Sequence, residues 1–85
     1  MQGHKLTGTQ IRAARGALNW SVQKLSDDSG VGSATIVRYE QIERVPKARK
    51  NNLDAIRKTL EAAGIEFIEA KDGAPGIIIR TAQTD

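Results

Sequence analysis

The chain has 85 residues, the size of one small domain, and its 13 Lys/Arg against 10 Asp/Glu give a net charge of +3. It has no cysteine and one histidine, which excludes a disulfide framework, a thiolate nucleophile and a cysteine-ligated zinc site, so we expect neither metal nor cofactor. No apolar run reaches membrane-spanning length and the first ten residues lack the hydrophobic core of a signal peptide, so we expect a cytoplasmic protein without membrane contact.

Charge is divided unevenly along the chain. Residues 1–60 hold eleven Lys/Arg against five Asp/Glu, whereas residues 61–85 hold two against five. A basic body attracts a polyanion because neutralised phosphates release counterions, and an acidic end is repelled by the same surface. On charge alone, an ordinary solvated surface explains this pattern equally well.

The first predicted helix runs from Thr7 to Leu18. Ile11 and Ala14 have helical spacing with Leu18, and either Thr7 or Thr9 can cap the first free amides.

A second helix of two to three turns is predicted in "NWSVQKLSDDSG". Asn19 or Ser21 can cap it, Val22 and Leu25 face inward, and Gly30 suits the left-handed conformation that ends many helices.

Two further helices follow the glycine break "GVGS". In "ATIVRYEQI", Ile36 and Tyr39 lie on one face and Ser33 can cap the helix. After the basic segment "RVPKARKNN", apolar residues at helical spacing predict a helix from Leu53 to a stop at Gly64.

Beyond residue 64 the sequence changes to strand-forming residues. "IEFIEA" alternates Ile65 and Phe67 with Glu66, "GIIIRT" is β-branched, and "KDGAPG" between them carries the turn signals Asp-Gly and Pro-Gly. The sequence therefore predicts a helical domain over residues 1–64 and a β-hairpin with a tail over residues 65–85.

The second and third helices with their glycine turn form a predicted helix-turn-helix, in which the second helix of the pair projects from the surface. The segment "IRAARGALNWSVQKLSDDSGVGSATIVRYE" has an Arg-bearing first helix, a Leu followed by a small residue, a turn glycine and a last helix ending in Glu. In this pattern, over about residues 6–64, the chain resembles the Cro/repressor-type (XRE-type) helix-turn-helix regulators.

The resemblance implies a mainly α fold, a lambda-repressor-like domain of four to five helices with a C-terminal β-hairpin. It also implies that Arg15 and Glu40 form a buried ion pair between the first helix and the end of the recognition helix. Many phage members have a Gln that braces the DNA contact where this chain has Val22, with Gln23 one position later.

The side of the third helix opposite Ile36 and Tyr39 would meet the major groove of DNA. Arg38 is its one long donor and can bind guanine O6 and N7 with two hydrogen bonds, so specificity would depend mainly on it. Ser33 is explained equally well as a cap. The predicted base-reading residues are Ser33, Ala34, Thr35, Val37 and Arg38.

Phosphate contacts are expected on both sides of that face. Ser21 and Gln23 lie at the amino end of the second helix, where free amides attract anions. On the other side lies a cationic segment that is either a phosphate clamp or solvated loop charge; its members are Arg44, Lys47, Arg49 and Lys50.

These features predict a DNA-binding transcriptional regulator and not an enzyme. We expect a repressor that binds an inverted repeat in double-stranded DNA as a homodimer. The alternative is an antiactivator or antitoxin-like interaction module that sequesters a protein partner, because Ala34 and Val37 make the face apolar.

The dimer interface is predicted in the hairpin. Consecutive isoleucines at 77, 78 and 79 place apolar side chains on both faces of one strand, which indicates that both faces are covered. We expect Ile77, Ile78 and Ile79, with Ile65 and Phe67, to form a contact between chains by sheet packing or by edge pairing.

Overall fold

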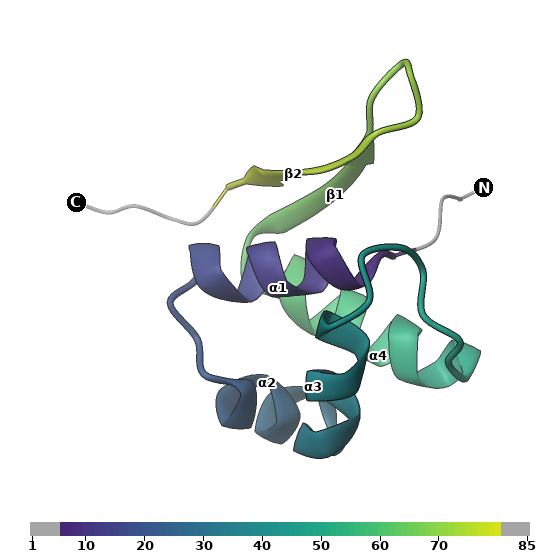
Figure 1. Cartoon of the computed structure of the whole chain (residues 1–85). Helices are drawn as coiled ribbons and strands as arrows, with labels where there is room; N and C mark the ends of the chain where they lie inside the picture. Colours follow the sequence, from purple (N-terminus) through teal and green to yellow (C-terminus); the bar gives the residue numbers. More distant parts are fainter. Residues whose placement is uncertain (1–5, 81–85) are drawn as a thin grey trace.

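A computed structural model of the chain describes residues 6–80 and shows four helices followed by a two-stranded antiparallel hairpin (Figure 1). The elements are α1 (Gly8–Ala17), α2 (Val22–Ser29), α3 (Ser33–Glu40), α4 (Lys50–Ala62), β1 (Ile65–Glu69) and β2 (Pro75–Ile79). The prediction of a mainly helical chain with a C-terminal hairpin is confirmed. The predicted tail from residue 81 onward lies outside the described residues.

The first two helices begin where polar side chains can cap them. Thr7 accepts from the Gln10 amide, and the Gln10 side chain accepts from the Thr7 amide, which makes a reciprocal capping box. Ser21 caps α2 by accepting from the Lys24 amide. Of the predicted alternatives, Thr7 and Ser21 are therefore the caps.

Three predicted element starts are wrong, and α3 ends at Glu40 rather than at Ile42. Ser33 is not a cap but the first residue of α3, because the Ile36 amide already bonds the Gly32 carbonyl at 3.0 Å. α4 begins at Lys50, three residues before Leu53, because the Arg49 carbonyl accepts the first helical bonds. β2 begins at Pro75 rather than after it, since the first residue of a strand tolerates a missing N–H.

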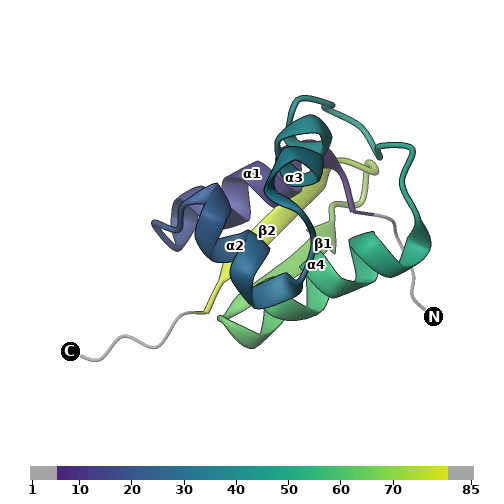
Figure 2. The ribbon, with the colours of Figure 1, turned by 90° about the horizontal axis from the view of Figure 1, so that it is seen from below.

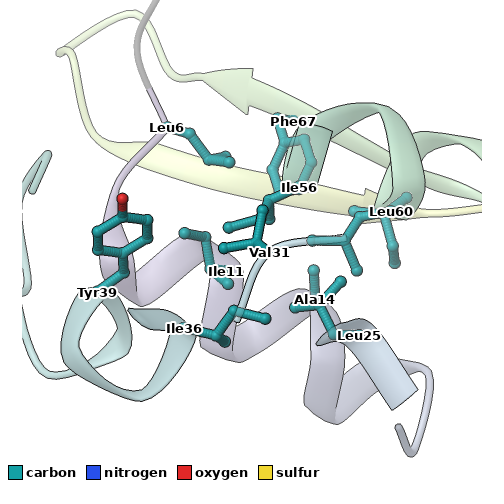
Figure 3. Packing of buried hydrophobic residues seen from close by; sticks show 11 residues of the cluster. Leu6, Ile11, Ala14, Leu25, Val31, Ile36, Tyr39, Ile56, Leu60 and Phe67 are labelled. Atoms are coloured by element: carbon teal, nitrogen blue, oxygen red, sulfur yellow. The ribbon is translucent and has the colours of Figure 1, made fainter. Parts of the chain in front are cut away.

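A single core joins all four helices to the hairpin (Figure 3). Ile11, Leu25, Ile36 and Ile56 are fully buried, one from each helix. The remaining buried apolar residues are Leu6, Ala14, Val31, Tyr39, Leu60, Ile65 and Phe67. Each helix is too short to be stable alone, so this shared burial is what stabilises it.

The hairpin belongs to the same core. Its inner face places Ile65 and Phe67 at 2% and 6% exposure, so both side chains are covered within their own chain, and their part in a dimer interface stays a prediction. Buried Gln10 ties α1 to the hairpin, because its side-chain amide donates to the carbonyls of Ile68 and Gly76 at 3.3 and 2.8 Å.

The two ends of the molecule are formed by different elements. α2 and α3 form its lower end in Figure 1, whereas the hairpin lies beyond α1 at the opposite end. Seen from below in Figure 2, α2 and α3 stand in front of the strands, which run between α1 and α4. Within residues 6–80, no helix combines the length and apolar character needed to cross a membrane.

Candidate nucleic-acid interface

The connection between α2 and α3 spans residues 30–32 and reverses the chain by means of one left-handed residue. Gly30 has φ 80°, and its amide bonds the Ser26 carbonyl at 2.9 Å, which ends α2. Val31 is then buried at 5% exposure and fixes the turn to the core. A residue with a Cβ would be strained at position 30, so the predicted role of this glycine is confirmed.

One side of α3 is buried and the other is free. Ile36 and Tyr39 face the core at 0% and 2% exposure, whereas Ala34, Val37 and Arg38 are exposed. Ser33 and Thr35, in the first turn, are half-buried. The five predicted base-reading residues therefore divide into a free face of three, which we call the α3 face, and two hydroxyl residues at its margin.

The Arg38 guanidinium lies 5.7 Å from the centroid of the Tyr39 ring. That ring is itself positioned from α4, since the Asn52 side-chain amide donates to the Tyr39 hydroxyl at 3.2 Å. Arg38 therefore extends from a well-anchored part of α3 into solvent, with its hydrogen-bonding groups available.

The amino end of α2, the helix that packs against α3, offers free donors. The amides of Val22 and Gln23 have no hydrogen-bond partner among residues 6–80, because the first helical bond is made by the Leu25 amide. Ser21 is exposed, and its hydroxyl proton is free to donate although its oxygen caps the helix. The Gln23 side chain instead donates to Asp27 at 2.8 Å, so its free main-chain amide is its better group for a phosphate.

The predicted cationic segment lies on the loop between α3 and α4, which passes the start of α1 (Figure 1). This loop is anchored: the Gly8 amide donates to the Arg44 carbonyl at 3.0 Å, and Pro46 is buried. Arg44, Lys47 and Arg49 are exposed and have no ion-pair partner in the described part of the chain.

Lys50 differs from the other three cations. It pairs with Asp54 one helical turn later at 2.9 Å, and this contact lowers the pKa of the Asp54 carboxyl. Its charge is therefore already partly compensated, which makes it the weakest member of the predicted phosphate clamp.

The predicted ion pair between α1 and α3 has the expected geometry. Arg15 Nε and Nη2 donate to the two carboxylate oxygens of Glu40 at 2.8 and 2.9 Å, and Nη1 donates to the Trp20 carbonyl at 2.8 Å. Glu40 is buried at 6% exposure, and the hydrogen bond to it raises the pKa of Arg15. This bidentate contact joins three segments: α1, the α1–α2 loop and the end of α3.

Sequence reasoning missed two residues that orient α3. Arg12 donates to the Glu40 carbonyl, so two arginines of α1 hold the same residue. Gly8 lies so close to α3 that an added Cβ would stand 2.1 Å from the Tyr39 carbonyl oxygen. The spacing of Arg12 and Arg15 on one helix face was a usable signal, whereas nothing local marks Gly8.

Comparison with protein-family models finds no match for this chain, and a search of curated proteins finds no significant match to its sequence. A function for this chain therefore has to be inferred from the arrangement of its own side chains.

Proposed function

We propose that this chain is a sequence-specific DNA-binding regulator of transcription, with a lambda-repressor-like helix-turn-helix fold. It acts in the cytoplasm, without catalysis, and represses by occupying an inverted repeat in double-stranded DNA as a homodimer. The observation that carries the proposal is the exposed α3 face, together with the unpaired amides at the start of α2, which packs against α3, and the uncompensated cations on the loop that follows α3.

In this proposal the α3 face enters the major groove. Arg38 donates two hydrogen bonds to guanine O6 and N7, while Ala34 and Val37 fill space or contact a thymine methyl group. Ser33 and Thr35, at the margin, reach a base edge or a phosphate. One short helix covers few base pairs, so a two-fold dimer that reads two half-sites supplies the additional affinity and specificity.

Phosphate contacts would fix the orientation of α3. The amides of Val22 and Gln23 and the Ser21 hydroxyl bind one strand, and Arg44, Lys47 and Arg49 bind on the other side. The hairpin, whose first strand ends at Glu69 and whose turn carries Asp72, lies at the end of the molecule away from α3, so these acidic residues do not oppose this contact.

Replacing Arg38 by Ala is expected to remove sequence preference while leaving nonspecific binding, because the guanine contact contributes about 1–3 kcal/mol of discrimination and the phosphate contacts remain. The measurement is selection from a random DNA library, followed by fluorescence anisotropy on the selected site. Lys71→Ala, which removes an exposed charge at the hairpin turn, is the charge-matched control and should keep the preference. If Arg38→Ala selects the same sequences as wild type, Arg38 does not read DNA.

Replacing both Arg44 and Lys47 by Ala is expected to weaken binding to all sequences alike. The slope of log K against log salt should fall by up to about two units, since each phosphate contact contributes about one. The double variant Lys58→Ala/Lys71→Ala loses the same charge from α4 and the hairpin turn and should change the slope far less. Equal slopes for the two double variants would show that the loop does not contact phosphate.

The second candidate function is a protein-interaction module on the same fold. The observation in its favour is the apolar character of the α3 face, where Val37 is 43% exposed and Ala34 lies beside it. Salt separates the two functions, because DNA binding weakens steeply with ionic strength and an apolar protein interface does not. A chain that binds no sequence from the random library at low salt would favour the protein module.

A further inference from the structure

β2 has a free edge whose unpaired backbone groups can be identified. The Arg80 amide bonds the Gly64 carbonyl, and the Ala70 amide bonds the Ala74 carbonyl. Hydrogen-bonded and non-hydrogen-bonded pairs alternate along an antiparallel ladder, so the pairs Ile65–Ile79 and Phe67–Ile77 point their N–H and C=O groups away from each other. Ile77 and Ile79 therefore present theirs at the outer edge of β2.

This edge lacks one common form of protection. In the register of the hairpin the amides of Ile77 and Ile79 do not bond β1, no other bond of theirs is found among residues 6–80, and the described sheet has only two strands. Proteins commonly protect such an edge with charged side chains. β1 carries Glu66 and Glu69, but β2 has no charged residue from Pro75 to Ile79, and Ile79 is 55% exposed.

The edge of β2 is complementary to itself. If a second β2 lies antiparallel with a two-fold axis at Ile78, Ile77 faces Ile79 of the second copy and each pair exchanges two hydrogen bonds. The free N–H and C=O groups of Ile77 and Ile79 are then all hydrogen-bonded in both copies. Ile78 faces Ile78 of the second copy on the outer face of the sheet.

The neighbouring face of α1 allows this approach. Gln10 bonds the Gly76 carbonyl, and Ala17 lies two turns further along the same side of α1. Ala13 and Ala17 are exposed, so two small side chains lie on the same side of α1 as Gln10.

The symmetry of such a sheet also orients the helices. Antiparallel neighbours in a sheet are related by a two-fold axis perpendicular to it. α1 and α4 lie on one side of the hairpin, so both copies keep their helices, and hence both α3 faces, on the same side of a four-stranded sheet. A second copy of this chain makes the backbone hydrogen bonds and also places its helices in this symmetric arrangement. A foreign peptide strand would make only the backbone hydrogen bonds.

We infer that two copies of this chain pair through β2 to form a continuous sheet in the order β1-β2-β2-β1, with the two-fold axis at Ile78. The inference rests on the homodimer of the proposed function, and its tests contain no DNA. A chain that dimerises in this way but ignores DNA would refute only the proposed function, and a DNA-binding monomer would refute only the pairing.

A cysteine cross-link tests the position of the axis, because the chain has no cysteine of its own. In the pairing, the Cα atoms of the two copies of residue 78 stand about 4.5 Å apart, within disulfide range. Ile78→Cys should therefore form a covalent dimer under mild oxidation at low protein concentration. Ile68→Cys is the matched control: it is half-buried on the same outer face, but its two copies lie three strand spacings apart, at least about 14 Å, and should not cross-link.

Sedimentation equilibrium tests the edge itself. Wild type should be a dimer, and Ile79→Lys should be a monomer because the substitution places a charge on the edge. Val37→Lys replaces a similarly exposed apolar residue on α3 and should remain a dimer. Circular dichroism checks that each variant is folded. The inference is overturned if wild type is a monomer, if folded Ile79→Lys is a dimer, or if residues 68 and 78 cross-link equally. If Ile79→Lys does not fold, the cross-linking experiment decides.

Discussion

Gly8→Ala is expected to destabilise the fold by about 3 kcal/mol, the upper part of the range for overpacking a core. An ideal Cβ on Gly8 would lie 2.0 Å from the Ile42 carbonyl oxygen and 2.1 Å from the Tyr39 carbonyl oxygen. Both atoms belong to the backbone at the end of α3, so no side-chain rotation relieves the clash. The start of α1 and the end of α3 must separate.

The same helix supplies a matched control for this substitution. Gly16 also lies in α1, but a Cβ there would meet nothing within 4 Å. Gly16→Ala should therefore stabilise the chain by about 1 kcal/mol, through helix propensity alone. Urea unfolding followed by circular dichroism, at one protein concentration, measures both. If the two variants shift the midpoint in the same direction, the close contact at Gly8 does not control the packing of α1 on α3.

Arg15→Ala is expected to cost about 3 kcal/mol of unfolding free energy, because it leaves the buried Glu40 carboxylate without its bidentate partner. Arg15→Lys keeps the charge but loses the bidentate contact, so its unfolding free energy should lie between those of Arg15→Ala and wild type. Adding Glu40→Gln to Arg15→Ala removes the unpaired charge and should recover part of the loss. The same urea titration measures all three.

An exposed pair in the same molecule serves as the reference. Arg80 and Glu66 are only 2.6 Å apart, but their side chains are 63% and 49% exposed, so Arg80→Ala should cost less than about 1 kcal/mol. If Arg15→Ala cost no more than Arg80→Ala, burial of Glu40 would not determine the strength of its ion pair. Because Glu40 ends α3, we also expect Arg15→Ala to weaken the proposed DNA binding in step with stability.

Features that depend on neighbours in the sequence could be read without the structure. Ser21 and Gly30 bound α2 because a hydroxyl and a missing Cβ act on the adjacent backbone, wherever the helix is placed. The alternation of Ile65 and Phe67 with Glu66 correctly assigned the buried side of β1. The Arg15–Glu40 pair was expected from a family resemblance rather than from spacing, and its geometry is as expected.

Features that depend on contacts between distant segments were decided only by the tertiary structure. Apolar alternation predicts that Ile65 and Phe67 are covered, but not by what; the structure buries them in the core of their own chain. Gly8 looks like any helical glycine until the end of α3 is packed against it. Gln10 caps α1 and also holds the hairpin 58 and 66 residues away. Local sequence determined which elements form and which side of each is apolar, because propensity and periodicity act over a few residues. Which element covers each apolar side depends on packing between residues far apart in the chain.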